Sequence, residues 1–424
     1  MNSLPQAITR YLQRRAAGGP WHISGSQRTD YRSAVVIPVL AESAALPATL
    51  ASLAANPPDL LAETLILLVV NQRPDSTAAD KADNLLLLQQ LESGDLNFPG
   101  LQLAWVDAAT PGLELPVKDG GVGLARKIGF DLTLSRLAWQ PEDPLLIALD
   151  ADTLVGADYL GALRRHFSAT SAGAAVVAFC HQPADSPAQQ RAITRYELFL
   201  RSHVLGLQLA GSPYAFHTVG STMVCRATVY ARAGGMNRRR AGEDFYFLQH
   251  LAKTAGVQQV SGTVVFPSPR PSSRTPFGTG RSVSALLAGQ EEAVLFYPPA
   301  CYRLLGGWLQ LVENRLGSDG AGLLQQARQL HGTATEFLER ENFATVWDRL
   351  ATNHPQPQAR RKAFHDWFDG LKTTRLIHHL CAGPFPRCQP QQAVPPLLQA
   401  AGLAPATDPA TQLTVLRRHQ GALA

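Results

Sequence analysis

The sequence predicts an α/β fold in which a mostly parallel, doubly wound sheet is flanked by helices and followed by a helical extension. Two observations lead to this. Short, nearly continuous apolar runs alternate with segments whose apolar residues recur at helical spacing, over residues 33–282. From about residue 283 onward the sequence shows helical patterns and no clear strand. Alternating strands and helices favour parallel pairing through right-handed crossovers.

The length and composition are those of a globular protein. The chain has 424 residues, of which 45% are hydrophobic and 17% charged, enough for one large α/β domain with an appendage. We divide it into an N-terminal arm with a short helix (1–30), an α/β domain (31–282) and a helical C-terminal region (283–424).

In the first half, apolar runs predict strands and amphipathic segments predict helices. The run Ser33 to Leu40 is the first strand, and the helix after it ends near Asn56-Pro57-Pro58. Glu63 to Val70 is the second strand. The remaining elements are a helix over 80–93, a strand over 101–107, a glycine-rich loop at 118–123, a helix over 123–139 and a buried strand that begins at Pro144.

The second half continues the alternation. It predicts a helix over 156–168, a strand over 174–180, a long helix over 187–210, a strand over 216–226, a short helix over 228–235, a helix over 243–255 and a strand near the end of 257–267. A loop rich in Pro, Ser, Arg and Gly fills 267–282 and ends the α/β domain.

Charge and cysteine content exclude several classes of protein. The net charge is +5 and the pI about 9.0, which fits a polyanionic small substrate, and the few short basic runs argue against nucleic-acid binding. Five irregularly spaced cysteines argue against a disulfide framework. The segment with His378, His379, Cys381 and Cys388 matches no common zinc spacing. Without a run of about 18 apolar residues or a signal-like N-terminus, we expect a cytoplasmic protein with no transmembrane segment.

Two aspartates follow the strand that begins at Pro144, in the sequence P-L-L-I-A-L-D-A-D. Asp150 and Asp152 fall at its C-terminal end, where ligands bind in open α/β sheets. Two carboxylates this close repel each other unless a cation neutralises them. Mg²⁺ or Mn²⁺ prefers oxygen ligands and shares its shell with substrate phosphates. The alternative is that Asp152 caps the next helix while Asp150 closes a turn.

Four stretches in this order resemble the family 2 glycosyltransferases, enzymes with the GT-A fold. They are V-V-I-P-V-L-A-E-S-A-A-L from Val35, K-D-G-G-V-G-L-A-R-K from Lys118, L-D-A-D from Leu149, and A-G-G-M-N-R-R-R-A-G-E-D from Ala233. The first is similar to a family motif of Pro, two residues, Asn and Glu; Pro38 and Glu42 match, and Ala41 replaces the Asn. The third matches the family's Asp-x-Asp metal motif. Together the four span residues 33–282.

The resemblance implies a soluble, non-processive, metal-dependent glycosyltransferase of the hexosyltransferase type (EC 2.4), which moves a sugar from a nucleotide-diphosphate sugar to an acceptor hydroxyl. Asp244 would be the general base of an inverting reaction, with Glu243 beside it. The metal would be held by Asp150 and Asp152, with His217 as a further candidate. The expected contacts to the nucleotide sugar are Pro38, Glu42, Asn71, Gly123, Arg126, Asp150, Ala151, Arg274 and Arg281; those to the acceptor are Gly220, Ser221 and Glu243.

Each of these residues also has a simpler interpretation. Glu243 and Asp244 could favour a helix N-terminus by charge alone, His217 could be a structural histidine, and the loop with Arg274 and Arg281 could be ordinary surface. Two other functions stay open: a nucleotidyltransferase, or a non-catalytic nucleotide- or glycan-binding protein that retains the fold. The donor nucleotide (uridine or guanosine diphosphate), a retaining instead of an inverting reaction, and a homodimer contact through the helical region also stay open.

Overall fold

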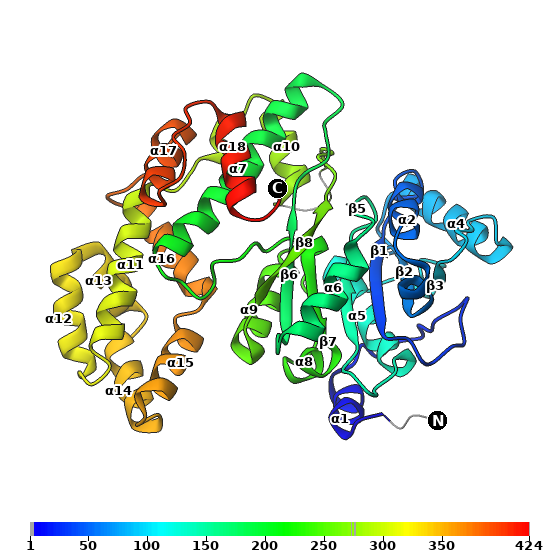
Figure 1. Cartoon of the computed structure of the whole chain (residues 1–424), viewed down its shortest axis with the longest axis horizontal. Coiled ribbons are helices and arrows are strands. Elements are labelled where there is room, and N and C mark those ends of the chain that lie inside the picture. Colours follow the sequence, from blue (N-terminus) through cyan, green and yellow to red (C-terminus); the bar gives the residue numbers. More distant parts are fainter. Residues whose placement is uncertain (1–3, 273, 275–276, 424) are drawn as a thin grey trace.

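The computed structural model describes residues 4–272, 274 and 277–423. An eight-stranded sheet lies at the centre of the α/β part, in the strand order β3-β2-β1-β4-β7-β6-β8-β5 (Figure 1). The strands are β1 (Ser33–Val39), β2 (Thr64–Asn71), β3 (Gln102–Ala108), β4 (Leu145–Ala148), β5 (Leu154–Val155), β6 (Ala174–Phe179), β7 (Met223–Arg226) and β8 (Gln258–Phe266). The predicted α/β sheet flanked by helices is confirmed.

Side chains on the two faces of the sheet enter two separate cores. Val36 of β1 and Leu67 of β2 belong to a core with α5 (Val122–Thr133), whereas Val35 and Ile66 belong to a core on the opposite face. Successive side chains of a strand point to opposite faces, so an apolar run without polar interruptions fills both cores. This is why β2, with every residue buried, reads as a continuous hydrophobic run.

Helices cover both faces. One face carries α1 (Gln6–Arg15), α5, α8 (Ala227–Arg232) and α9 (Glu243–Ala255). The other carries α2 (Leu46–Ala54), α3 (Pro58–Ala62), α4 (Ala78–Ser93) and α6 (Tyr159–Ala169). Helix α1, expected in a surface arm, buries Ile8 and Tyr11, and the Tyr11 hydroxyl lies 2.7 Å from Asp131 Oδ1. The N-terminal helix is therefore part of the packed structure.

The strand order reverses between β1 and β4, which creates a crevice. β1 pairs with β4 only from Ser33 to Val36 before β4 ends. Pro38 lies two residues after Val36, on the same edge of β1, where the missing N–H of proline costs no ladder hydrogen bond. Ligands in open α/β sheets bind at such a switch point, beyond the carboxyl ends of the strands.

The second half of the sheet departs from purely parallel pairing. β4 and β6 both pair antiparallel with β7, and β5 pairs antiparallel with β8. The strand predicted over 216–226 is wrong in extent: a 3₁₀ turn at Gly220–Thr222 precedes β7. The alternation read in this segment therefore belongs in part to a turn, in which Ser221 and Thr222 are both buried.

The C-terminal region is helical, as expected. Its helices are α10 (Thr279–Leu287), α11 (Pro299–Asn314), α12 (Gly320–Leu330), α13 (Gly332–Arg340), α14 (Phe343–Asn353), α15 (Pro357–Trp367), α16 (Gly370–Ala382), α17 (Pro390–Ala400) and α18 (Pro409–His419). A 3₁₀ turn at Glu291–Val294 lies between α10 and α11, and another at Leu134–Arg136 follows α5. Long helix α7 (Pro187–Leu209) shares their core and lies among α10, α17 and α18 in Figure 1. The domain boundary near 283 stays a prediction.

A buried charged cluster joins α7 to α18. Glu197 of α7 accepts hydrogen bonds from Arg417 at 2.7 and 2.6 Å and from Arg201 at 2.7 Å. Burial raises the pKa of Glu197, but Arg417, His181 and Arg201 outweigh it and hold that pKa well below its usual value. The last described helix is thereby fastened to the centre of the molecule.

The two edges of the sheet are both restricted. At β3, Ser24 pairs with Trp105 through N–H···O bonds of 2.8 and 3.0 Å. At the other edge, β5 has two residues. None of the described helices is both long and apolar enough to cross a bilayer.

Candidate functional site

A cluster of carboxylates and arginines lies beyond the carboxyl ends of β1 and β4. Asp150 and Asp152 form part of the turn that follows β4, in which the Thr153 N–H donates to the Asp150 carbonyl at 3.1 Å. Two side chains fix the backbone of this turn: Thr49 donates to the Ala151 carbonyl at 2.8 Å, and Gln182 donates to that of Asp152 at 2.9 Å. The turn is therefore held from both sides.

Asp152 is in an environment that disfavours its charge. Burial, followed by the negative charges of Asp150 and Glu42, raises the pKa of Asp152 to about 7. Arg270 opposes this shift from 3.4 Å. A second positive charge at this place would restore the ionised carboxylate.

Arg126 joins the aspartate turn to the beginning of α9. Its guanidinium forms ion pairs with Asp150 and with Glu243, and its side chain is 2% exposed. Burial lowers the pKa of Arg126, but attraction by Asp150 and Glu243 outweighs it, so that the pKa is raised and the charge retained. Arg126 lies in the first turns of α5, after the glycine-rich segment.

Glycine at position 220 provides the space for this guanidinium. A Cβ on Gly220 would lie 2.9 Å from Nη1 and 3.0 Å from Cζ of Arg126, closer than such atoms pack. Gly220, expected to contact the acceptor, therefore contacts Arg126. Its neighbour Ser221 is fully buried, and its hydroxyl has no hydrogen-bond partner among the described residues.

Glu243 and Asp244 begin helix α9. The Asn237 side-chain amide donates to the Glu243 carbonyl at 2.8 Å, which fixes the loop before the helix. Burial and the nearby Glu243 charge raise the pKa of Asp244 to about 7, against the attraction of Arg126. Burial likewise raises the pKa of Glu243. Asp244 thus has the pKa of a side chain that accepts and releases a proton near neutral pH.

Glu42 connects the end of β1 to the loop after β8. Its Oε1 accepts from Arg270 and Arg274, each at 2.5 Å, while its buried Oε2 has no partner among the described residues. Arg274 also donates to the Ala41 carbonyl at 3.2 Å. Residues 273, 275 and 276 of this predicted loop lie outside the described residues. Arg281 is exposed in the first turn of α10.

Ala41 has a left-handed backbone conformation, with φ at 50°. Residues other than Gly, Asn and Asp rarely adopt it. The N–H of Ala41 donates to Asn84 Oδ1 at 2.8 Å, and its carbonyl accepts from Arg274, so hydrogen bonds on both sides stabilise this conformation. The resembled motif carries Asn here, and Asn tolerates the left-handed region.

Several residues that were predicted to contact the ligand contact other residues of the protein. The Asn71 amide donates to the carbonyls of Val39 at 2.9 Å and Val69 at 3.0 Å. A Cβ on Gly123 would lie 3.0 Å from the Asn237 carbonyl and from Glu243 Cβ, so this glycine allows α5 to approach the 237–243 loop. Pro38 lines the crevice edge of β1 as described above.

The contacts of His217 are with Gln420 and Phe179, which lie outside the aspartate turn. Its Nε2 lies 3.0 Å from Gln420 Oε1, and its ring packs edge-on against Phe179 with centroids 4.9 Å apart. Burial, aided by Arg201, lowers the pKa of His217 to about 3. These are the surroundings of a structural histidine; the predicted role as a metal ligand gains no support from them.

The aspartate turn offers donors of the kind that Mg²⁺ or Mn²⁺ prefers. Among the residues described, no group of three or more His, Cys, Asp or Glu side chains is arranged to hold a metal ion. Two carboxylates can suffice where substrate phosphates complete the shell. The raised pKa of Asp152 and the unpartnered Oε2 of Glu42 fit a site that lacks part of its positive charge.

The side chains that hold this site together were not found from the sequence. Thr49, Asn84 and Gln182 fix the backbone at Ala151, Ala41 and Asp152. No motif marks them, because any polar side chain of suitable length on the adjacent element could serve.

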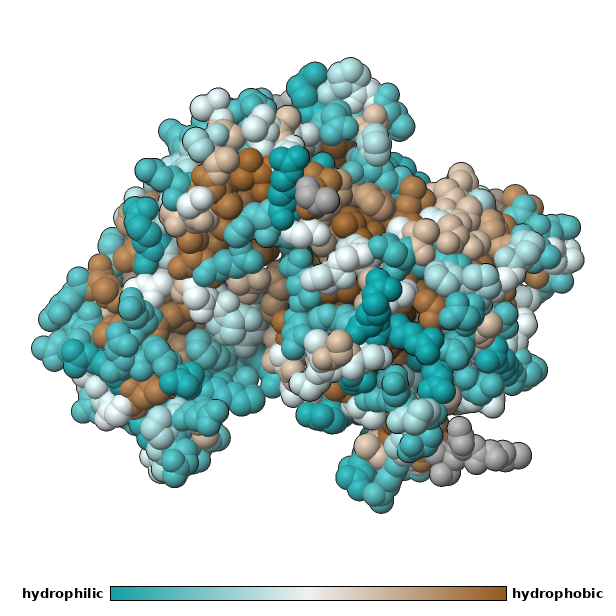
Figure 2. Space-filling model, viewed as in Figure 1, coloured by the Kyte–Doolittle hydropathy of each residue, from teal (hydrophilic) through white to brown (hydrophobic). Residues whose placement is uncertain are grey.

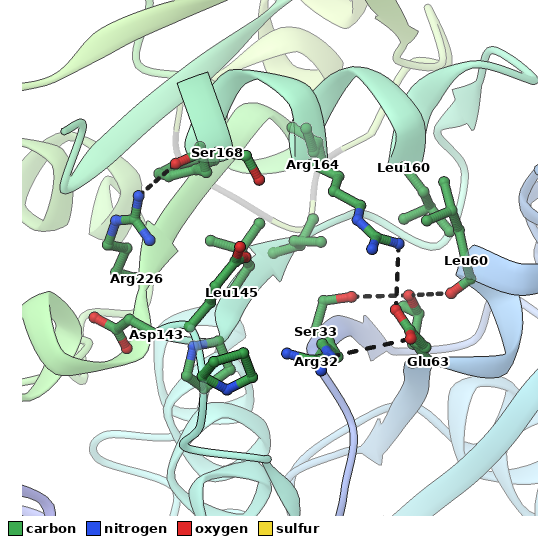
Figure 3. A pocket seen from close by; sticks show the side chains of 17 residues that line it. Arg32, Ser33, Leu60, Glu63, Asp143, Leu145, Leu160, Arg164, Ser168 and Arg226 are labelled. Carbon is green, nitrogen blue, oxygen red and sulfur yellow. Dashed lines mark hydrogen bonds and ion pairs between the residues drawn. The ribbon is translucent and has the colours of Figure 1, made fainter. Parts of the chain in front are cut away.

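A second hollow lies at the opposite ends of the strands. A cavity of about 270 Å³ is lined by residues at the beginnings of β1, β2 and β4. Figure 3 shows Arg32 and Arg164 directed toward Glu63 and Arg226 directed toward the Phe167 carbonyl, to which it donates. The N–O distances to Glu63 are 4.0 Å for Arg32 and 3.3 Å for Arg164. Because these charges are already paired, the cavity is a weaker candidate than the carboxylate cluster.

Comparisons with known proteins find only distant likeness. No protein-family model and no curated protein matches the chain. Among solved structures it is similar to S. aureus TarS 1-349 in complex with UDP-GlcNAc (13% identity, 92% of each chain, TM-score 0.39). It is also similar to the mannosyltransferase PcManGT from Pyrobaculum calidifontis in complex with GDP-Man and Mn²⁺ (14% identity, 86% of this chain and 93% of that one, TM-score 0.38).

A third similar structure is glucosyl-3-phosphoglycerate synthase from Mycobacterium tuberculosis in complex with Mn²⁺, UDP and glucosyl-3-phosphoglycerate (13% identity, 68% of this chain and 82% of that one, TM-score 0.35). Likeness at this distance carries nothing about the chemistry of this chain, which has to be judged from its own residues.

Proposed function

We propose that the chain is a metal-dependent glycosyltransferase that moves a sugar from a nucleotide-diphosphate sugar to an acceptor hydroxyl, with inversion. One observation carries this: Arg126 links the aspartate turn after β4 to the Glu243–Asp244 pair of α9. A diphosphate-binding element and a base with a pKa near 7 thereby share one cluster at the crevice.

The donor would lie over the aspartate turn. Asp150 and Asp152 would hold Mg²⁺ or Mn²⁺, which when bound supplies Lewis-acid stabilisation of the diphosphate leaving group. Thr49 and Gln182 keep the turn in place by binding its carbonyls. Arg126 balances the charge of Asp150 from inside the protein, which leaves the solvent side of that carboxylate for the ligand.

Asp244 would take the proton of the acceptor hydroxyl. As that oxygen forms its bond to the anomeric carbon, the bond from this carbon to the diphosphate oxygen breaks, and the proton passes to a carboxylate oxygen of Asp244. With its pKa raised to about 7, Asp244 is a stronger base than an ordinary aspartate and is still ionised in half the molecules at pH 7.

Arg270 and Arg274 would leave Glu42 and pair with the diphosphate when the donor binds. Both reach Glu42, and their side chains are 44% and 38% exposed, so they can turn toward a diphosphate without crossing the core. Arginine binds phosphate oxygens in pairs through its planar donors. The two guanidinium groups would then neutralise the leaving group, and their side chains would exclude water from the crevice.

Thermal unfolding with a panel of nucleotide diphosphates and nucleotide sugars, with and without Mn²⁺, tests the proposal. A ligand at about one hundred times its Kd adds about 2.7 kcal/mol of stability. We expect metal-dependent stabilisation by one nucleotide in the wild type and none in Asp152→Ala. NMR of the product's anomeric proton then distinguishes inversion from retention.

Two results would contradict the glycosyltransferase proposal. If a folded protein gains no stability from any nucleotide, the transferase proposal is wrong. Stabilisation by a nucleotide sugar that is never consumed, with or without acceptors, would instead favour a non-catalytic binding protein.

A further inference from the structure

A cavity of about 230 Å³ lies where the α/β part meets the C-terminal helices. Its walls come from α7, α9, α16 and the 214–219 segment, and include Phe199, His203, Phe216, Phe245, Tyr297 and Thr373. Figure 2 shows the molecular surface indented between the C-terminal helices and the sheet-bearing part. The cavity is separate from the paired charges of Figure 3.

The cavity adjoins the proposed catalytic cluster on two sides. Phe245, which lines it, directly follows Asp244 in α9. Val219, which also lines it, directly precedes Gly220, the residue in contact with Arg126. Two lining residues are therefore direct sequence neighbours of the proposed base and of the glycine that contacts the buried arginine.

Helix α7 makes the third connection. Tyr196 is close enough to Asp244 that, after burial, this charge is the next cause that raises the pKa of the phenol, to about 12. Residues spaced three or four apart share one face of a helix. From Tyr196 that face continues through Phe199, His203 and Leu207, all of which line the cavity.

The lining is uncharged. None of the described residues that line the cavity is Asp, Glu, Lys or Arg. His203 is held by Tyr302, with its Nδ1 2.9 Å from the hydroxyl, and burial lowers its pKa to about 4, so it is neutral at pH 7. A nearby cation, Arg387, is already engaged with the hydroxyl and ring of Tyr297. A phosphate or carboxylate would therefore lose its hydration here without a counter-charge from any described lining side chain.

The size suits one ring. A dry cavity of about 150 Å³ in another protein holds benzene, and this one is somewhat larger. Aromatic walls favour edge-on or offset contact with a flat ring.

We infer that this cavity is the acceptor site, and that the acceptor is an uncharged molecule whose ring-sized apolar group fills it while a hydroxyl reaches Asp244. The inference rests on the proposed function, and it adds the chemical class of the second substrate. The apolar group would supply binding energy, and the hydroxyl would be the nucleophile.

Isothermal calorimetry with three probes tests the inference, in the presence of Mn²⁺ and the nucleoside diphosphate that stabilises the protein. Phenyl β-D-glucoside and methyl β-D-glucoside share their hydroxyls and differ in the ring, and phenyl phosphate carries the ring with charge. We expect phenyl glucoside to bind at least about tenfold more tightly than either of the others.

Two variants are designed to fill the cavity, each from a different wall. Val204→Trp on α7 and Thr374→Phe on α16 each place a ring in the cavity, and two such variants protect the test if one fails to fold. Leu209→Trp is the matched control, since Leu209 is on α7 and 41% exposed. Both blocking variants should weaken phenyl glucoside binding by about tenfold, with the nucleotide-induced rise in Tm unchanged; the control should bind as the wild type does.

The outcomes separate the two proposals. Equal binding of phenyl and methyl glucoside, with nucleotide stabilisation intact, overturns the inference and leaves the transferase proposal standing. Equal binding of phenyl phosphate and phenyl glucoside overturns the uncharged class. If no nucleotide stabilises the protein, the calorimetry is run with Mn²⁺ alone, and tight phenyl glucoside binding then overturns the proposed function, and the acceptor assignment with it.

Discussion

Gly220 and Arg126 are in contact: the space that a side chain at position 220 would occupy is filled by the guanidinium that binds both Asp150 and Glu243. The two residues are far apart in the sequence, yet they define one packing unit. A change at Gly220 should therefore act on the charged cluster through Arg126.

Gly220→Ala should destabilise the protein and reduce transfer activity together. The added methyl forces Arg126 to move, and overpacking in a tight site typically costs about 1–3 kcal/mol. Chemical denaturation measures the loss. Gly332→Ala is the control, because a Cβ there meets nothing within 4 Å; it should change stability by less than about 0.5 kcal/mol. Equal effects of the two variants would show that Arg126 adjusts freely.

Activity should rise with pH and level off above an apparent pKa of about 7. Asp244 acts as a base only when ionised, and its pKa is raised to about 7, so the active fraction falls as pH drops through this value. Asp244→Asn should lower kcat by about 10²- to 10⁴-fold and abolish this limb.

The control for this change is nucleotide binding. Asp244→Asn should keep the metal-dependent rise in Tm, since the aspartate turn is untouched. A variant that retains the wild-type pH profile would assign the base to another residue.

Asp152→Asn should make the metal-free protein more stable at pH 8 and leave it unchanged near pH 4. The pKa of Asp152 is about 7 in the folded state, against roughly 3.9 for an unfolded aspartate. A raised carboxyl pKa means that the folded state binds more protons between these values, so wild-type stability falls as pH rises from about 4 to 7.

At one pKa unit per 1.4 kcal/mol, and allowing for partial exposure, the gain at pH 8 should be about 2 kcal/mol. Denaturation midpoints across pH 4 to 8 measure it. Asp185→Asn, at an exposed position before α7, is the matched control. A constant difference between wild type and Asp152→Asn at every pH would contradict the expected charge repulsion.

Ala41→Gly should stabilise the protein. Relief of the left-handed strain on alanine, about 1–2 kcal/mol, exceeds the added backbone entropy of glycine, about 0.5–1 kcal/mol. Ala51→Gly, at an exposed position in the interior of helix α2, should instead destabilise by about 1 kcal/mol. Thermal melts of the two variants give opposite signs if the φ of 50° at Ala41 is real strain, and the same sign if it is not.

The sequence predicted the strands well where both faces are buried and less well where the chain turns. β1, β2 and β6 agree because continuous apolar runs have few alternatives. The segment before β7 was misjudged, since the position of Gly220 depends on Arg126 from another helix.

The candidate site shows the same division. Asp150 and Glu243 stand in recognisable motifs, and the structure brings them together on Arg126. His217, a further candidate metal ligand from the resemblance, contacts Gln420 instead. Ala41 departs from the resembled motif in residue type and has a left-handed backbone, a conformation that residue identity alone does not reveal.

The restricted edges of the sheet bear on how this protein behaves in concentrated solution. An exposed edge strand offers free N–H and C=O groups on which another molecule can add a strand. Here β3 is bridged by Ser24 and β5 spans two residues. Intermolecular sheet growth, the first step toward fibrils, therefore has little template in the folded state, and deletion of the segment around Ser24 should increase aggregation relative to the full chain, as measured by light scattering.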